Sequence, residues 1–306
     1  PRYESRDLGL RFTHPNLRTY RLDDFRWEEW AEAHRHLLDS GRPLAALIEF
    51  PVADFLPIVD RVKAYGGRVV YDLIDDWTTS LGGNWYRPEV EKAFVDRADV
   101  LTATAAPLAD RLRELSGRPV HLLPNAVNTR LFVPNRGYWR PVDLPQADWV
   151  MIYVGALWGE WFDWELLVRL ADAYPEAAVV IVGDYRGQCP EQRPNLYFLG
   201  LKPQRDLPAY LAHADVTIIP WKVNKITQAT SPLKVYEYLA MRRPVVAPDI
   251  EPLRGIPGVW LARDSEEFVK LVHHVRWIDY PLEEVRDFIN QNNWEKRVHT
   301  LCNLVL

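Results

Sequence analysis

The most informative part of this chain is Thr230-Ser231-Pro232-Leu233-Lys234-Val235-Tyr236-Glu237-Tyr238-Leu239-Ala240-Met241. Ser231 is a favourable N-cap residue and Pro232 suits the first helical position, so this spacing predicts a helix that starts here. The run Arg243-Pro244-Val245-Val246-Ala247 follows directly and has the apolar character of a buried strand. The stretch therefore predicts a loop, a helix and a strand in close succession.

Lys234 falls in the first turn of that helix, where the helix dipole disfavours a cation. Its position makes sense if an anion lies beside it, because the free N–H groups at a helix start form an anion site. Glu237 follows three residues later on the same helix face. The pair would then hold a phosphate and sugar hydroxyls. An ordinary capped helix with a surface ion pair is the alternative, and these residues alone leave both interpretations open.

The same stretch resembles the donor-binding segment of retaining glycosyltransferases with the two-domain GT-B fold, in the large group 1 family usually numbered four. Further motifs of that family occur in the expected order, and they are Leu122-Leu123-Pro124-Asn125-Ala126-Val127-Asn128, Tyr153-Val154-Gly155-Ala156-Leu157, Asn195-Leu196-Tyr197-Phe198-Leu199-Gly200 and Asn293-Trp294-Glu295-Lys296-Arg297. The resemblance covers roughly residues 68 to 306. It implies a nucleotide-sugar-dependent enzyme.

Length and composition agree with a globular protein of two domains. The chain has 306 residues, of which 48% are hydrophobic and 26% charged. The net charge of −5 argues against a dedicated nucleic-acid-binding protein, which would carry a basic face. No apolar run approaches the ~18 residues of a membrane span. Any phosphate site must therefore be a local cluster of positive charge.

Strand-like apolar runs alternate with helical patterns, which is typical of parallel α/β sheets. Strands are expected at Leu44–Phe50, Arg68–Leu73, Val100–Ala103, Val120–Leu123, Trp149–Val154, Ala178–Val182, Leu196–Leu199, Val216–Ile219 and Pro244–Ala247. Helices are expected near 24–39, 52–65, 86–97, 105–116, 163–173, 205–213, 232–241, 265–276 and 282–290.

This alternation predicts parallel α/β sheets, and the resemblance implies a GT-B-like arrangement of two Rossmann-like domains whose parallel sheets face a central cleft. We expect an acceptor-side domain over 1–133, a linker over 134–147, a donor-binding domain over 148–290 and a C-terminal helix over 291–306. A complete first domain of this family would open with a strand and a glycine-rich loop, whereas this chain opens with the polar stretch Arg2–Leu22. The first domain is therefore expected to be truncated or reduced.

The expected donor site lies at the carboxyl edge of the second sheet, where parallel sheets bind ligands. Its phosphate-binding residues are Thr230, Ser231, Leu233 and Lys234, joined by Lys225. In the family, an arginine often follows the first-strand glycine and a lysine comes a few residues later, but here Ala156 and Trp161 stand in those places. We therefore infer that Lys225 and Lys234 bind the diphosphate, although Lys225 could instead be a solvated surface lysine.

The resemblance assigns Glu237 to the ribose hydroxyls of the donor. The family often carries a second glutamate eight positions earlier, and here that position is Ala229. Gly155 and Gly183 end two strands and would let the ligand approach the backbone. Asp184 follows the second glycine, and Leu201 follows the third strand where the family contacts the nucleobase. Tight strand-to-helix turns are the alternative explanation for the glycines.

Asp75 and Asp76 directly follow the strand Arg68–Leu73, at the edge where a cleft would lie. One of them could orient the acceptor hydroxyl or contact the donor sugar, so both are catalytic candidates with Lys234. Capping of the next element is the alternative role. The chain has no Asp-x-Asp motif and no cysteine pair with zinc spacing, so we expect no metal.

The resemblance thus implies a retaining hexosyltransferase-type enzyme without a cofactor. Its donor would be a nucleoside diphosphate sugar, with UDP or GDP as the nucleotide. Its acceptor would be a glycan or a lipid-linked glycan in cell-surface polysaccharide synthesis. We expect a cytoplasmic location, with peripheral contact to the inner face of the membrane left open. The alternatives are an epimerase or hydrolase on the same fold, or a subunit that binds nucleotide sugars without catalysis.

Overall fold

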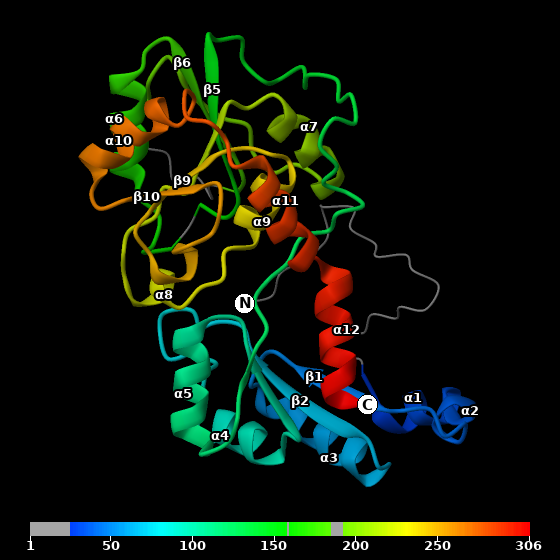
Figure 1. The fold of residues 1–306 in the computed structure, drawn as a ribbon. Helices are drawn as coiled ribbons and strands as arrows, with labels where there is room; N and C mark the ends of the chain where they lie inside the picture. Colours follow the sequence, from blue (N-terminus) through cyan, green and yellow to red (C-terminus); the bar gives the residue numbers. More distant parts are fainter. Residues whose placement is uncertain (1–24, 158, 185–191) are drawn as a thin grey trace.

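The computed structural model describes residues 25–157, 159–184 and 192–306. They form two parallel α/β domains, shown in Figure 1. The four-stranded domain has the strand order β1-β2-β3-β4, with β1 at Ala45–Ile48, β2 at Arg68–Leu73, β3 at Val100–Ala103 and β4 at His121–Leu122. The polar stretch at residues 2–22 lies outside the described residues.

The six-stranded domain has the strand order β10-β9-β8-β5-β6-β7. Its strands are β5 at Trp149–Val154, β6 at Ala177–Val182, β7 at Leu196–Phe198, β8 at Val216–Ile218, β9 at Val245–Pro248 and β10 at Val259–Ala262. Every residue of β5 and β6 is buried, because helices cover both faces of a parallel sheet. The predicted bounds of β2, β3 and β5 are confirmed, whereas β10 was not predicted.

Helices connect these strands. In the first part of the chain they are α1 (Trp27–Ala33), α2 (Arg35–Leu38), the 3₁₀ turn η2 (Ala53–Phe55), α3 (Leu56–Ala64), α4 (Pro88–Arg97) and α5 (Ala106–Ser116). In the second part they are α6 (Trp164–Ala173), η3 (Gln204–Asp206), α7 (Leu207–Ala212), α8 (Lys225–Gln228), α9 (Leu233–Ala240), η4 (Glu251–Leu253), α10 (Ser265–His274), α11 (Leu282–Gln291) and α12 (Trp294–Val305).

The predicted helix near 24–39 is divided at His34, which has non-helical backbone angles. The ring Nδ1 of His34 lies 2.7 Å from the carbonyl oxygen of Trp30. This side chain therefore forms a hydrogen bond with a carbonyl group near the end of α1. Elsewhere the expected capping chemistry operates. Asp163 caps α6 by accepting a hydrogen bond of 3.1 Å from the N–H of Leu166.

The prediction that Ser231 caps α9 is wrong, because Pro232 occupies the cap position and α9 begins at Leu233. The Ser231 hydroxyl oxygen instead accepts a hydrogen bond of 3.1 Å from the N–H of Asn125. The Asn125 amide also donates to the carbonyl oxygen of Ser231 at 2.6 Å. A polar link from the loop after β4 thus replaces the local cap and joins the two domains.

The chain returns to the four-stranded domain at its end. Figure 1 shows α12 lying along the first sheet, and Val305 packs there against Val70 and Val100. Val69 and Tyr71 face the other side of the same sheet, where α3, α4 and α5 pack. Residues alternate between the faces of a strand, so α12 covers the face that the other helices leave open.

Candidate functional site

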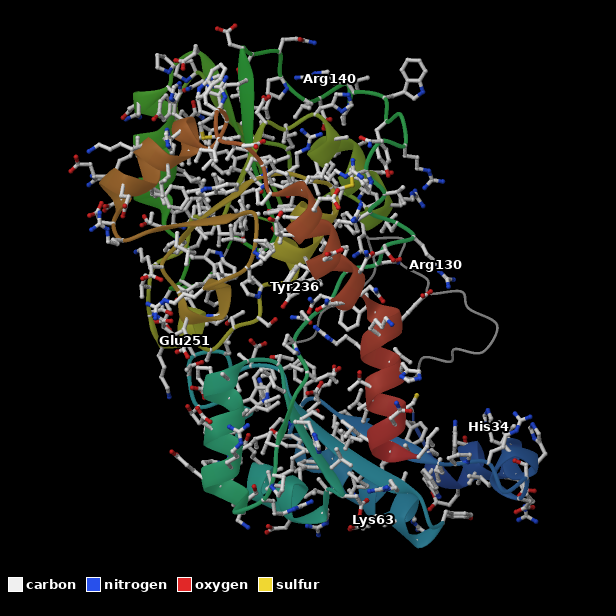
Figure 2. The ribbon with its side chains drawn as sticks, viewed as in Figure 1. His34, Lys63, Arg130, Arg140, Tyr236 and Glu251 are labelled. Atoms are coloured by element: carbon white, nitrogen blue, oxygen red, sulfur yellow. The ribbon has the colours of Figure 1, made fainter. Side chains whose placement is uncertain are left out.

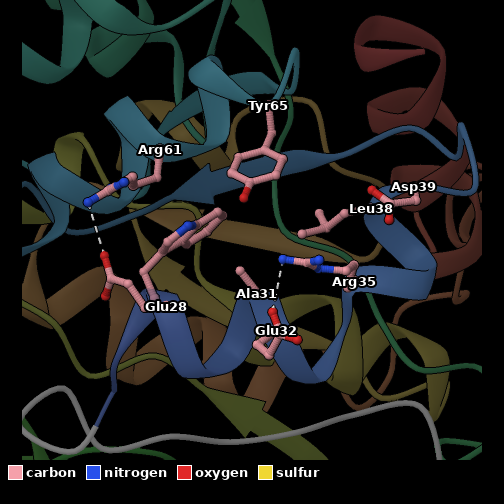
Figure 3. Close-up of a pocket in the computed structure, with 9 residues that line it drawn as sticks. Glu28, Ala31, Glu32, Arg35, Leu38, Asp39, Arg61 and Tyr65 are labelled. Atoms are coloured by element: carbon pink, nitrogen blue, oxygen red, sulfur yellow. Dashed lines mark hydrogen bonds and ion pairs between the residues drawn. The ribbon is translucent and has the colours of Figure 1, made fainter.

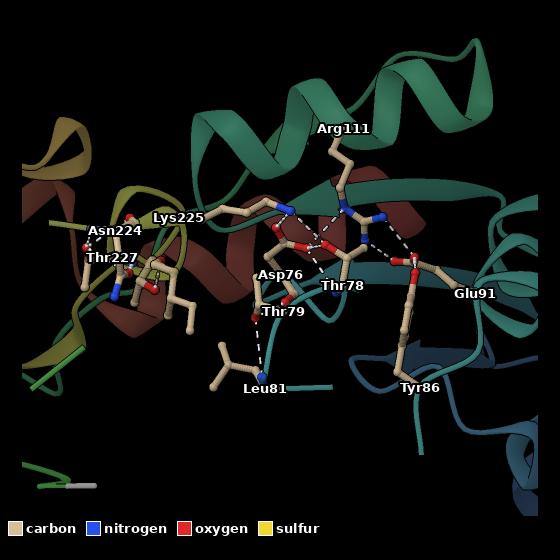
Figure 4. Close-up of polar contacts among 12 residues, drawn as sticks. Asp76, Thr78, Thr79, Leu81, Tyr86, Glu91, Arg111, Asn224, Lys225 and Thr227 are labelled. Atoms are coloured by element: carbon tan, nitrogen blue, oxygen red, sulfur yellow. Dashed lines mark hydrogen bonds and ion pairs between the residues drawn. The ribbon is translucent and has the colours of Figure 1, made fainter. Parts of the chain in front are cut away.

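The carboxyl ends of the two sheets meet in this structure. Lys225 begins α8 after β8, and its Nζ lies 3.0 Å from Oδ2 of Asp76, which follows β2. The same ammonium donates to the Thr78 hydroxyl at 2.9 Å, as Figure 4 shows. Ser80 donates to Glu160 at 2.9 Å across the same junction. Because open parallel sheets bind ligands at their carboxyl edges, this junction is the candidate site.

Lys234 lies at the carboxyl edge of the second sheet, where its ammonium is close to the rings of Trp221 and Tyr153. Its Nζ is 4.4 Å from the centroid of the Trp221 ring and 5.1 Å from that of Tyr153. Trp221 Nε1 donates to the Tyr153 hydroxyl at 3.3 Å, and that hydroxyl donates to the carbonyl oxygen of Ala156 at 2.8 Å. The rings are therefore fixed in place, and cation–π attraction holds the ammonium between them.

Within the described residues, Lys234 forms no ion pair or hydrogen bond with a carboxylate. Burial lowers the pKa of Lys234 to about 8, and the charge of Glu237 only partly opposes this effect. A cation removed from water without a bonded anion is costly, so an anionic ligand beside it would be strongly favoured. The prediction that Lys234 lies in the first helical turn is confirmed.

Of the two glycines that follow β5 and β6, Gly155 lies against this lysine and Gly183 packs against Gly155. A Cβ on Gly155 would lie 2.6 Å from Cε and 3.0 Å from Nζ of Lys234. A Cβ on Gly183 would lie 1.9 Å from the carbonyl oxygen of Gly155. Neither position has room for a side chain, because the strand ends and the lysine converge there. Asp184 directly follows this crowded point.

Glu237 is buried one turn further along α9. Burial raises the pKa of its carboxyl to about 7, against the opposing effects of Gln204 and Lys234. Gln204 Nε2 donates to Oε1 of Glu237 at 3.3 Å. Leu201 is exposed after β7, and the N–H of Gly183 donates to the carbonyl oxygen of Gly200 at 3.0 Å. Sequence reasoning missed Gln204, which shares the segment after β7 with Leu201.

The hydroxyls of Thr230 and Ser231, in the predicted phosphate-binding loop, already form hydrogen bonds within the protein. Thr230 Oγ1 donates to the carbonyl oxygen of Ile226 at 2.7 Å, and the Ser231 hydroxyl is bonded to Asn125. Leu233 and Lys234 are the first two residues of α9, so their N–H groups have no partner within the helix. The Ser231 hydroxyl also lies 3.4 Å from the Tyr236 hydroxyl, with which it can share a hydrogen bond. Backbone donors and the lysine are therefore the groups best placed for an anion.

The two candidate catalytic aspartates differ in their surroundings. Asp76 is only 4% exposed and accepts a hydrogen bond of 2.6 Å from the Thr78 hydroxyl. Burial alone would raise the pKa of Asp76, but the hydrogen bonds from Thr78 and Lys225 outweigh it and lower the pKa. Asp75 has no hydrogen bond to its carboxylate among the described residues. Burial, with the charge of Asp76, raises the pKa of Asp75 to about 6.

A buried ion pair supports this edge of the four-stranded domain. Glu91 is 1% exposed, and Arg111 contacts both of its carboxylate oxygens. Tyr71 and Tyr86 donate to the same carboxylate at 2.8 and 2.7 Å. Arg111 Nε also lies 3.9 Å from Asp76 Oδ1, so the network extends to the domain junction (Figure 4). Sequence reasoning missed this pair because α4 and α5 each carry an ordinary amphipathic pattern.

A cavity of about 320 Å³ lies elsewhere, between α1, α2 and α3 (Figure 3). Its charged side chains pair with each other, since Arg61 contacts Glu28 at 3.0 Å and Arg35 contacts Glu32 at 3.1 Å. Self-paired charges leave no free cation for a phosphate. The domain junction therefore remains the candidate site, and Figure 2 shows Tyr236 of α9 beside it.

Within 25–157, 159–184 and 192–306, no three His, Cys, Asp or Glu side chains gather in a group that could hold a metal ion. In the same residues, no helix combines the length and the apolar character that a bilayer span requires.

Two parallel α/β domains whose carboxyl edges meet through Lys225 and Asp76 have the arrangement of the GT-B fold. Residues 149–276 match the family model described as glycosyl transferases group 1. Over these residues the chain is similar to the group 1 glycosyltransferases, and its described residues have the GT-B fold of the solved structures that it resembles.

Relatives and solved structures agree with this assignment. A Bacillus subtilis (strain 168) protein named TuaH, for a teichuronic acid biosynthesis glycosyltransferase, is 25% identical over 274 residues, covering 78% of this chain and 68% of TuaH. Sucrose-phosphate synthase from Thermosynechococcus elongatus superposes with a TM-score of 0.65 at 18% identity, covering 90% of this chain and 76% of that one. Anabaena HepE in complex with UDP and glucose gives 0.63 at 13% identity, covering 90% and 81%.

Proposed function

We propose that this protein transfers a hexose, with retention, from a UDP-sugar to a glycan or lipid-linked acceptor in cell-surface polysaccharide synthesis. The observation that carries the proposal is the ammonium of Lys234, which lies over the Trp221 ring and beside Gly155 and has no bonded carboxylate among the described residues. The name of TuaH supports the polysaccharide context. The UDP and glucose bound to HepE support the choice of donor.

The donor would lie across the ends of β5, β6 and α9. Its diphosphate would contact Lys234 and the first N–H groups of α9, and its ribose hydroxyls would donate to Glu237. The base would extend toward Leu201 and Gln204. Ala229 packs in the core of the four-stranded domain, so contacts made by a glutamate at that position in relatives must come from other residues here.

The reaction breaks the bond between the anomeric carbon of the sugar and the diphosphate oxygen. The acceptor oxygen forms its bond to the same carbon on the same face, and its proton passes to the departing phosphate. The charge of Lys234 stabilises the departing diphosphate, which is the main electrostatic contribution. Asp75, which has no hydrogen bond to its carboxylate among the described residues, would accept a hydrogen bond from the acceptor hydroxyl and orient it.

Ribose recognition by Glu237 gives the decisive test of the donor site. Glu237→Gln should weaken binding of UDP while leaving binding of its 2′,3′-dideoxy analogue almost unchanged, because only the ribose hydroxyls use the carboxylate. Calorimetric titration of both ligands into wild type and variant measures this difference. Equal losses for both ligands, or no loss for either, would show that Glu237 does not bind the ribose.

A second assay separates transfer from the alternatives. The protein is incubated with radiolabelled UDP-glucose and a mixture of oligosaccharide acceptors, and the products are resolved. Labelled oligosaccharide indicates transfer, free glucose indicates hydrolysis, and a changed sugar nucleotide indicates epimerisation. We expect transfer to persist in excess chelator, since Lys234 supplies the positive charge at the diphosphate. Activity that disappears with chelator and returns with manganese would contradict that expectation.

A further inference from the structure

An aromatic cluster lies at the carboxyl edge of the four-stranded domain. Phe50 follows β1 by two residues, and its ring centroid is 5.0 Å from that of Trp77, which follows β2. Trp85 completes the cluster at 5.3 Å from Trp77 and 6.2 Å from Phe50. Strands β1 and β2 are parallel neighbours, so these rings share one edge of the sheet.

The cluster leaves an apolar surface open. Phe50 is 43% exposed although its ring contacts the buried ring of Trp77. Trp85 is also partly exposed. Trp77 is buried behind them, and its Nε1 has no hydrogen-bond partner among the described residues. A buried donor without a partner is costly, and a flat apolar surface beside it suits a ligand with both a carbon face and hydroxyls. A pyranose ring has both.

The position of the cluster relates it to the reaction. Trp77 directly follows Asp76, which holds Lys225 of the other domain, and Asp75 precedes that contact. The aromatic surface thus begins within two residues of the carboxylate proposed to orient the acceptor. Donor-binding groups lie on the other domain, so this surface is on the acceptor side of the junction.

The charges on this edge are negative. Glu49 directly precedes Phe50, and its charge acts on Asp72, whose pKa burial raises to about 6. Among the described residues, Arg111 is bound to Glu91 and Lys225 to Asp76. Arg87, two residues after Trp85, donates to the carbonyl oxygens of Asn84 and Tyr86. An acceptor sugar that carries a carboxylate or phosphate would meet like charge from Glu49 and Asp75.

We propose that Phe50 and Trp85, backed by Trp77, form a stacking platform for an uncharged sugar ring of the acceptor, and that Glu49 and Asp75 exclude anionic rings from it. This proposal rests on the proposed transferase function and specifies its acceptor. Carbon–hydrogen faces of a sugar pack on aromatic rings, while the neighbouring carboxylates accept its hydroxyls. Specificity then arises from repulsion as well as attraction.

The test is calorimetric titration of the UDP-saturated protein with two probes, an oligosaccharide ending in glucose and a matched one ending in glucuronate. We expect the glucose-ended probe to bind at least about tenfold more tightly. Phe50→Ala should weaken that binding by about tenfold, and Phe50→Tyr should retain it, since only the first removes the ring. Affinity for UDP should be equal in all three proteins.

Trp139→Ala is the matched control, because Trp139 is 93% exposed on the linker and should not affect either probe. Phe50 is partly exposed, so its variants should fold, which thermal unfolding verifies. Failure of the glucose-ended probe to bind, preference for glucuronate, or an unchanged affinity in Phe50→Ala would each overturn the platform. If UDP still binds in those cases, the donor site stands and only the acceptor assignment fails.

Discussion

The carboxyl edges of the two sheets differ in whether their buried charged side chains have a partner of opposite charge. At the edge of the four-stranded domain, Glu91 is bound by Arg111 and two tyrosines, and Asp76 is bound by Lys225 and Thr78. At the edge of the six-stranded domain, the ammonium of Lys234 lies over the rings of Trp221 and Tyr153 and forms no ion pair with a carboxylate among the described residues. Paired charge holds the first edge in shape, whereas the unpaired cation leaves the second edge incomplete until an anion arrives.

Substitution of Glu91 is expected to have the largest effect on stability, because this carboxylate belongs to the ion pair at the edge of the four-stranded domain. Glu91→Gln removes the charge but keeps the volume, so Arg111 is left buried without its partner. We expect the four-stranded domain to lose about 3–5 kcal/mol of unfolding free energy. Urea unfolding followed by circular dichroism measures the loss. Tyr86→Phe removes a single hydrogen bond and should cost only about 1 kcal/mol. Similar values for the two variants would contradict a structural ion pair.

The pH dependence of stability tests the unpaired edge. Burial raises the pKa of Glu237 to about 7, above its ordinary value of 4.5, so the folded protein favours the protonated form. The stability from this group is complete below pH 4.5 and is lost as the pH rises through about 7. The loss is on the order of 3 kcal/mol, from 1.36 kcal/mol for each pKa unit.

Thermal unfolding between pH 4 and 8 follows this loss in wild type and in Glu237→Gln, which cannot ionise. Glu237→Gln should be the more stable protein at pH 8, and the difference should disappear near pH 4. The exposed Glu114 provides the control, and Glu114→Gln should track the wild type throughout. A pH profile of Glu237→Gln that matches wild type would show that the carboxyl is not desolvated.

Lys234 gives the direct test of the unpaired cation. Lys234→Ala should weaken UDP binding by about 1.5–3 kcal/mol, which is typical of a hydrogen bond to a charged group. Binding of uridine should hardly change, because uridine has no diphosphate. Calorimetric titration of both ligands measures the difference, and Lys222→Ala serves as the control since Lys222 is an exposed lysine of the neighbouring loop. An equal loss for uridine would remove Lys234 from the phosphate site.

The sequence predicted correctly those strands and helix positions that depend on residues close together in the chain. The bounds of β2 and β5 and the place of Lys234 follow from apolar runs and helix chemistry near each residue. The packing of Gly183 on Gly155, and of Gly155 on Lys234, could be expected only in outline, from the rule that strands of a parallel sheet end at one edge.

Contacts between distant segments determined the remainder. Ser231 looked like a cap because the pattern around it is that of a cap, yet Asn125, 106 positions earlier, binds it. Trp221 follows β8 by three residues, so the strand-end rule could have identified it as a neighbour of Lys234. Nothing in the helix patterns could pair Glu91 with Arg111, since amphipathic spacing reports which face is buried and not which partner lies there.

The contact between the two edges provides the smallest and most specific test. Asp76 holds Lys225, whose side chain is 69% exposed, so a diphosphate would compete with this carboxylate for the same ammonium. Asp76→Asn should therefore raise UDP affinity by about two- to fivefold, while weakening the domain contact by about 0.5–1 kcal/mol. Ser80→Ala removes the other polar contact across the junction without freeing a cation, so its UDP affinity should stay at the wild-type value. Titration of UDP into both variants decides the matter. Weaker binding by Asp76→Asn would mean that Asp76 positions Lys225 for the donor, and the two edges would then act together instead of in competition.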